Sequence, residues 1–113
     1  MALMAVAFPI VPGKTDDWRK FIGELNGPRR AEFVASRKTI GLRERTFLQP
    51  TPMGDMVIVT LEGDDPGRSF GQLASSTDPF TKWFLERVQE LHGVDLAHAA
   101  SGPMPEQVLD TAG

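Results

Sequence analysis

The chain contains no cysteine, which removes several kinds of chemistry at once. Without a thiol it can form no disulfide, no thiolate metal site and no cysteine nucleophile. Histidine is nearly as scarce, because only His92 and His98 occur. Their spacing of six differs from the i, i+4 pair that places two imidazoles on one helical face for zinc. A structural metal site is therefore not expected.

An excess of positive charge is also absent, since the 113 residues carry a formal net charge of -3. Nucleic-acid binding depends on a basic surface, so no nucleic-acid partner is expected. The sequence shows no Ser-His-Asp motif, no G-x-G-x-x-G fingerprint and no P-loop. Hydrolase, dinucleotide-binding and nucleotide-binding functions therefore have no support from motifs.

A targeting or membrane segment is not indicated either. The opening stretch "MALMAVAFPIVPG" is apolar, but no positively charged region precedes it, and Pro9 and Pro12 interrupt it. A signal peptide needs a positively charged region before its apolar stretch. The two prolines interrupt the run before it is long enough to span a bilayer as a helix. We expect a cytoplasmic protein with no membrane partner.

What is present is ordinary for a globular domain: 41% hydrophobic and 24% charged residues. A chain of this length holds one hydrophobic core. We expect residues 1–100 to form that domain and residues 101–113, which include Pro103 and Pro105, to form a C-terminal tail.

Three segments have the pattern of β-strands. The runs 2–11 and 56–61 are short and almost continuously apolar, which is typical of strands buried on both faces. Residues 42–50 alternate instead, and a turn at 51–55 joins them to the next strand as a hairpin. One face of this strand carries Leu42, Glu44, Thr46 and Leu48.

Helical spacing marks the segments between the strands. The sequence predicts helices over 15–26, capped by Thr15, over 28–39, over 69–74, and over 79–92, capped by Asp78. Residues 94–99 are predicted to form a last strand. The order β-α-β-β-α-β indicates a ferredoxin-like α+β fold with an antiparallel four-stranded sheet.

The two continuously apolar strands fall at the centre of such a sheet. Two helical connections can cover only one face of the sheet. The other face would still be apolar, because neither Ala5 and Ala7 nor the residues that alternate with them are polar. A second copy of the same sheet is the economical cover, which predicts a homodimer.

The stretches "RERTFLQPTPMGDMVIVTLEGDDP" and "DPFTKWFLERVQELHGVDL" carry a resemblance to a known group. With the order of elements, they resemble the dimeric α+β barrel superfamily, in particular its small antibiotic-biosynthesis-monooxygenase-like members. Relatives include cofactor-independent monooxygenases, muconolactone isomerases, aromatic polyketide cyclases and heme-binding enzymes. The resemblance implies two ferredoxin-like subunits packed sheet to sheet, each with a pocket between its sheet and its helices.

Glu44 and His92 are the candidate acid/base residues. Glu44 shares its strand face with apolar residues, and such surroundings raise a carboxyl pKa and suit a proton shuttle. The alternative is an ion pair with Arg87. His92 titrates near neutral pH, but as the last residue before Gly93 it could instead turn toward the carbonyls ending its own helix.

The candidate substrate-binding residues are aromatic or basic. Trp18, Trp83 and Phe84 form either the core or the wall of a pocket for a flat aromatic ligand. Arg45 either attracts an anionic substrate or is simply a solvated strand residue.

Two functions follow for comparison. The favoured one is a cofactor-independent enzyme that oxygenates, isomerises or cyclises an aromatic or polyketide-like molecule, with Glu44 or His92 transferring the proton. The alternative is a non-catalytic, ligand-binding or stress-related dimeric module. The resemblance also leaves open a heme-binding form, with His92 as ligand and Trp83 on the macrocycle, although no cofactor is expected.

Overall fold

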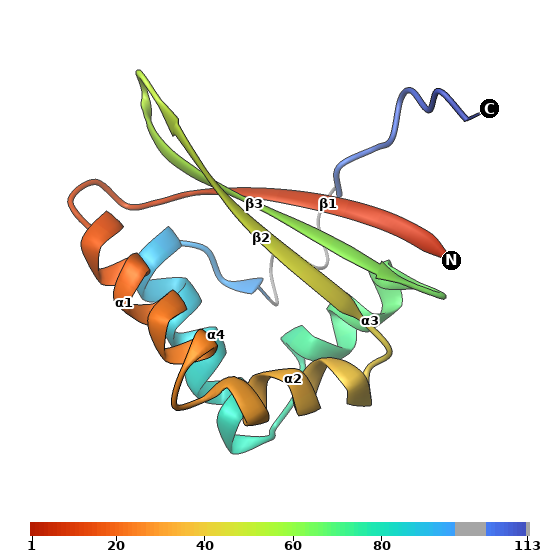
Figure 1. Cartoon of the computed structure of the whole chain (residues 1–113), viewed down its shortest axis with the longest axis horizontal. Helices are drawn as coiled ribbons and strands as arrows, with labels where there is room; N and C mark the ends of the chain where they lie inside the picture. The colour runs from red at the N-terminus through yellow and green to blue at the C-terminus, as the bar shows by residue number, and fades with distance from the viewer. Residues whose placement is uncertain (97–103, 113) are drawn as a thin grey trace.

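The computed structural model describes residues 1–96 and 104–112 (Figure 1). The elements run in the order β1 (Ala2–Pro9), α1 (Thr15–Asn26), α2 (Arg30–Thr39), β2 (Arg43–Thr51), β3 (Gly54–Gly63), α3 (Pro66–Ala74) and α4 (Pro79–His92). The predicted α+β class is confirmed, and the order of these elements fits the ferredoxin-like arrangement.

The sheet has three strands in the described part of the chain. Both β1 and β2 pair antiparallel with β3, which gives the order β1-β3-β2 with β3 at the centre. The fourth strand predicted at 94–99 is not formed by 94–96, because residues 94 and 95 have no regular structure and Leu96 is helical and buried in the core. Residues 97–99, and with them His98, lie outside the described residues.

The four helices of the described residues lie on one side of the sheet (Figure 1). Alternation along β1 points Val6 toward them, while Ala5 and Ala7 point away and are exposed. The single chain leaves β1 exposed on this face at Ala5 and Ala7, and the predicted cover by a second copy stays a prediction.

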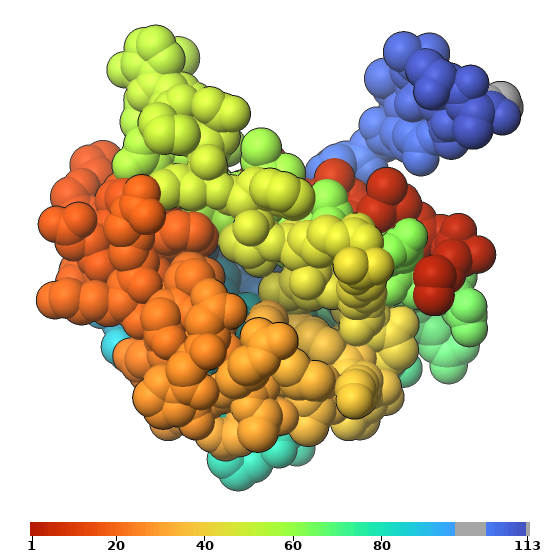
Figure 2. Space-filling model, in the orientation of Figure 1, coloured from red at the N-terminus to blue at the C-terminus, as the bar shows by residue number. Residues whose placement is uncertain are grey.

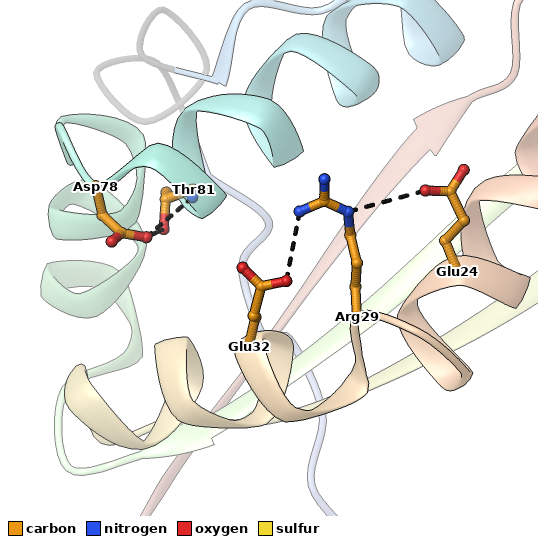
Figure 3. Close-up of polar contacts among 5 residues, drawn as sticks. All are labelled: Glu24, Arg29, Glu32, Asp78 and Thr81. Atoms are coloured by element: carbon orange, nitrogen blue, oxygen red, sulfur yellow. Dashed lines mark hydrogen bonds and ion pairs between the residues drawn. The ribbon is translucent and has the colours of Figure 1, made fainter.

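Helix ends follow local rules in most places. The Asp78 carboxylate accepts a hydrogen bond from the Thr81 backbone N–H at 3.1 Å, as predicted for the cap of α4 (Figure 3), and Gly93 ends this helix in the left-handed conformation at φ 67°. The cap predicted for α1 is wrong. Thr15 is already helical, and its hydroxyl donates to Asp55 Oδ2 at 2.6 Å instead.

A charged cluster joins α1, α2 and α4 on the outside of the helical layer. Arg29 lies 3.9 Å from a carboxylate oxygen of Glu24 and 3.5 Å from one of Glu32 (Figure 3). Its guanidinium carbon also lies 4.0 Å from the centre of the Trp83 ring. Trp83 is thus fixed beneath a cation, an arrangement worth about 0.5–2 kcal/mol.

The C-terminal segment leaves the domain on the side of the sheet opposite the helices (Figure 1). Val108 and Leu109 are 83% and 80% exposed there. No helix among residues 1–96 and 104–112 combines the length and the hydropathy that crossing a membrane requires.

Candidate functional site

A cavity lies between the inner face of the sheet and the helices. It offers about 60 Å³ to the centre of a water-sized sphere, and the molecular surface is hollowed between α1 and β2 (Figure 2). A single buried water needs about 10–15 Å³ in this measure, so the space suits a few waters or one small ring. Most of its lining is apolar, and its polar lining residues are Arg37, Glu44, Thr46 and His92.

An ion pair stands at one end of this cavity. Arg37 Nε donates to Glu44 Oε1 at 2.7 Å, and the two side chains are only 5% and 9% exposed. The inward direction of Glu44 and an ion pair for it were predicted, but the partner was not. Arg87 pairs with Glu90 at 2.8 Å on the surface of α4 instead.

Arg37 is a site residue that the sequence analysis missed. Its Nη1 donates to Ser36 Oγ at 2.9 Å, and its guanidinium carbon lies 4.6 Å and 4.5 Å from the ring centres of Phe33 and Phe84. Its Nη2 is buried and has no hydrogen-bond partner within the described residues. The signal was its position four residues after Phe33, which places both on the same helical face.

His92 stands at another part of the cavity lining. Its Nδ1 lies 2.8 Å from the Pro9 carbonyl oxygen, so Nδ1 carries the proton and donates. The imidazole also packs 5.7 Å from the Phe8 ring. The expectation that it turns toward the end of its own helix is therefore wrong. With Nδ1 occupied, the lone pair of the neutral imidazole is on Nε2.

Burial lowers the pKa of His92 below its ordinary value of 6.5, and the hydrogen bond to the Pro9 carbonyl opposes that shift without reversing it. The folded chain therefore holds a neutral imidazole at pH 7. A neutral imidazole with a free ring nitrogen is chemically suited to accept a proton.

The two polar ends of the cavity are well separated. Glu44 pairs with Leu61 on β3, whereas Phe8, the neighbour of His92, pairs with Val57. These rows are four residues apart along β3, which corresponds to roughly 13 Å. Glu44 and His92 therefore line different parts of the cavity.

The depressed pKa of His92 makes stability depend on pH. Below pH 6.5 the unfolded chain binds the proton and the folded chain resists it, so we expect the free energy of unfolding to fall as pH drops from 6.5 through the lowered folded pKa. The slope is at most about 1.4 kcal/mol per pH unit. Urea titrations between pH 7.5 and 5 measure it.

The control for this experiment uses both histidines of the chain. His92→Asn should flatten the slope between pH 7 and 5.5, where carboxylates barely titrate. His98→Asn, which removes the other imidazole, should retain it. A slope that survives His92→Asn would assign the effect to a different group.

Only some of the remaining candidates line the cavity. Trp18 and Phe84 belong to the core and also line the cavity, whereas Trp83 and Arg45 are not among its lining residues. Trp83 packs under Arg29, and Arg45 Nη2 lies 3.6 Å from a Glu62 carboxylate oxygen on the outer face. Strand alternation directs Arg45 to the outer face, whereas Trp83 packs against Phe21, a lining residue, with ring centres 5.6 Å apart.

Within the described ranges, no group of three or more potential ligand side chains is arranged to hold a metal ion. His92 and Trp83 do not share the cavity, so the pairing that a heme site would need is not formed by these two residues. No family model, curated protein or solved structure matches the chain. The interpretation of the site therefore depends on its own geometry.

Proposed function

We propose that this protein binds a small ring-containing molecule in the cavity between sheet and helices and acts on it by proton transfer, without a cofactor. The observation that carries the proposal is an apolar cavity with an ion pair at one end and an imidazole of lowered pKa elsewhere in its wall. Buried titratable groups gathered in a cavity are typical of functional sites. The resemblance to antibiotic-biosynthesis-monooxygenase-like proteins supports the same class of chemistry.

The reaction would begin with removal of a proton from a carbon next to a substrate carbonyl. The C–H bond breaks, the proton goes to Glu44 or His92, and the electron pair moves into the carbonyl to give an enolate. Return of a proton at another carbon isomerises the molecule, and attack on a second carbonyl cyclises it. Transfer of an electron to dioxygen, the oxidant, begins an oxygenation.

Cavity size restricts the substrate further than the sequence did. About 60 Å³ for water-sized centres corresponds to roughly four or five water-sized groups, which is close to one ring. A single-ring substrate fits the observed space. A polyketide-like molecule of several rings would fit only through widening at the hollow between α1 and β2.

The proposal includes a homodimer formed through the outer face of the sheet. Ala7, Ile58 and Phe47 are paired neighbours on β1, β3 and β2 and form an apolar row across this face. Leu3 and Phe47 are 55% and 51% exposed in the single chain. A second copy would cover these side chains, as the continuous apolar runs of β1 and β3 require.

Acetophenone is a single-ring probe for the proton transfer. In D₂O, the protein should accelerate deuteration of its methyl group, as followed by NMR. Loss of the base should slow this by about 100-fold, so Glu44→Gln and His92→Asn, measured separately, identify which residue acts. Arg45→Gln, on the outer face of the same strand as Glu44, should have no effect.

Binding is read independently from the two tryptophan indole N–H signals. Trp18 lines the cavity and Trp83 does not, so acetophenone should shift only the signal that remains in Trp83→Phe. Binding without deuteration would contradict the catalytic proposal and favour the non-catalytic ligand-binding module. If no signal shifts, the cavity is not a binding site for such molecules.

A further inference from the structure

The hydrogen bonds of Arg37 are incomplete. Its guanidinium has five N–H donors, and the structure uses Nε on Glu44 and Nη1 on Ser36. Nη2 is buried and has no partner in the described part of the chain. A buried donor on a charged group is costly to leave unpaired. Because Arg37 also lines the cavity, a ligand is positioned to supply the missing acceptor.

The charge of the site decides which acceptor fits. Arg37 and Glu44 form a formally neutral pair, and the lowered pKa of His92 keeps that imidazole neutral at pH 7. Thr46 is the remaining polar lining residue and carries no charge. A carboxylate ligand would therefore bring an uncompensated negative charge into an apolar cavity, whereas a neutral carbonyl oxygen would not.

We propose that the cavity selects a single-ring ligand with a neutral carbonyl oxygen, which accepts a hydrogen bond from Nη2 of Arg37. This inference depends on the proposed function and names its substrate class. It also distinguishes the two candidate bases. A carbonyl held by Arg37 places its α-carbon close to Glu44 and roughly 13 Å of strand away from the row of His92.

The proton transfer then has defined partners. The α C–H bond breaks, a Glu44 carboxylate oxygen takes the proton, and the electron pair forms the enolate, whose oxygen Nη2 of Arg37 stabilises. A donor already fixed at the developing oxyanion needs no rearrangement during the reaction. Phe33 and Phe84, which pack on the guanidinium, hold that donor in place.

Three single-ring probes test the proposal on the unmodified protein: acetophenone, α-methylstyrene, in which CH₂ replaces the carbonyl oxygen, and benzoate. A plain apolar cavity would prefer the hydrocarbon, because a carbonyl would lose its hydrogen bonds to water without replacement. We expect acetophenone to bind about tenfold more tightly than α-methylstyrene, and benzoate more weakly than acetophenone. The shift of the Trp18 indole signal gives each Kd.

The double variant Arg37→Met/Glu44→Leu removes the pair without leaving a lone buried charge and should bind the hydrocarbon better than the ketone. Arg87→Met/Glu90→Leu, the matched surface pair, should keep the wild-type preference. Equal or tighter binding of α-methylstyrene by the unmodified protein would overturn the role of Arg37, and tighter binding of benzoate would overturn the neutral carbonyl. If acetophenone and α-methylstyrene both fail to bind, the proposed function fails, and this inference with it.

Discussion

Glu44→Leu should lower the free energy of unfolding by about 3–5 kcal/mol, one of the largest effects of any single substitution in this chain. The change leaves the Arg37 guanidinium, whose side chain is 5% exposed, without its carboxylate. A buried charge that has lost its partner cannot regain water without opening the contact between α2 and β2. Arg37→Met should have a comparable effect, since it leaves the buried Glu44 carboxylate without its partner. Urea unfolding measures both.

The double variant Arg37→Met/Glu44→Leu should be far milder than the sum of the single ones. Replacing both members of a buried ion pair with apolar groups of similar size is often close to neutral. Methionine can also pack its thioether against Phe33 and Phe84, whose rings now contact the guanidinium. The double-mutant cycle should therefore give a coupling of several kcal/mol.

The surface pair Arg87–Glu90 is the matched control, because its N–O distance of 2.8 Å is nearly the same as the 2.7 Å of the buried pair. Its side chains are 41% and 45% exposed. Solvent screening should hold its coupling below about 1 kcal/mol. Additive effects of the Arg37 and Glu44 substitutions would contradict the buried pair and the arrangement of the cavity end that depends on it.

For the Arg37–Glu44 ion pair, the sequence predicts the direction of one side chain but not its partner. Alternation along β2 placed Glu44 on the inner face, because that property depends only on a two-residue period. Its partner depends on which helix packs over that end of the strand. Arg87 and Arg37 both lie on helices, and the tertiary packing of α2 against β2, which no local pattern reports, selects Arg37.

At His92, too, the local feature could be predicted from the sequence and the tertiary contact could not. Gly93 was predicted to end α4, and it does so with φ 67°, because only local backbone geometry is involved. The direction of the imidazole depends on the Pro9 carbonyl, 83 residues away in sequence. The predicted strand at 94–99 fails at its described residues for a related reason. A short apolar run can be a strand or part of a buried helix, and Leu96 is helical.

On the outer face of the sheet, the apolar sequence pattern of the strands differs from the exposure that the single chain shows. Continuous apolar runs predicted strands covered on both faces, yet the helices of the described residues lie on one side, and Ala5 and Ala7 are exposed on the other. Tail residues including Pro105 and Leu109 line a groove with Leu3 and Ala5 on this face, and a second copy of the sheet would cover the apolar row of Ala7, Ile58 and Phe47. That reasoning underlies the homodimer proposal.

Ala7→Asp should convert a dimer into a monomer. At about 25 cal/mol per Å², an interface of roughly 1,600 Å², half of it apolar, provides about 20 kcal/mol before association costs. Association costs of up to about 12 kcal/mol would leave the roughly 8 kcal/mol that micromolar affinity requires. Ala7 lies in the apolar row with Ile58 and Phe47. Two-fold symmetry would bury two unpaired carboxylates, which should weaken association by about 1,000-fold or more.

Sedimentation at about 10 μM distinguishes the outcomes, since the chain has a mass of 12.4 kDa and a dimer would have twice that. Ala31→Asp is the control, because Ala31 is exposed on α2, in the helical layer on the opposite side of the sheet. It should leave the dimer intact, and circular dichroism should show that both variants remain folded. If the unmodified protein sediments as a monomer, the outer face has no second copy on it, and the resemblance to dimeric α+β barrels loses its main physical support.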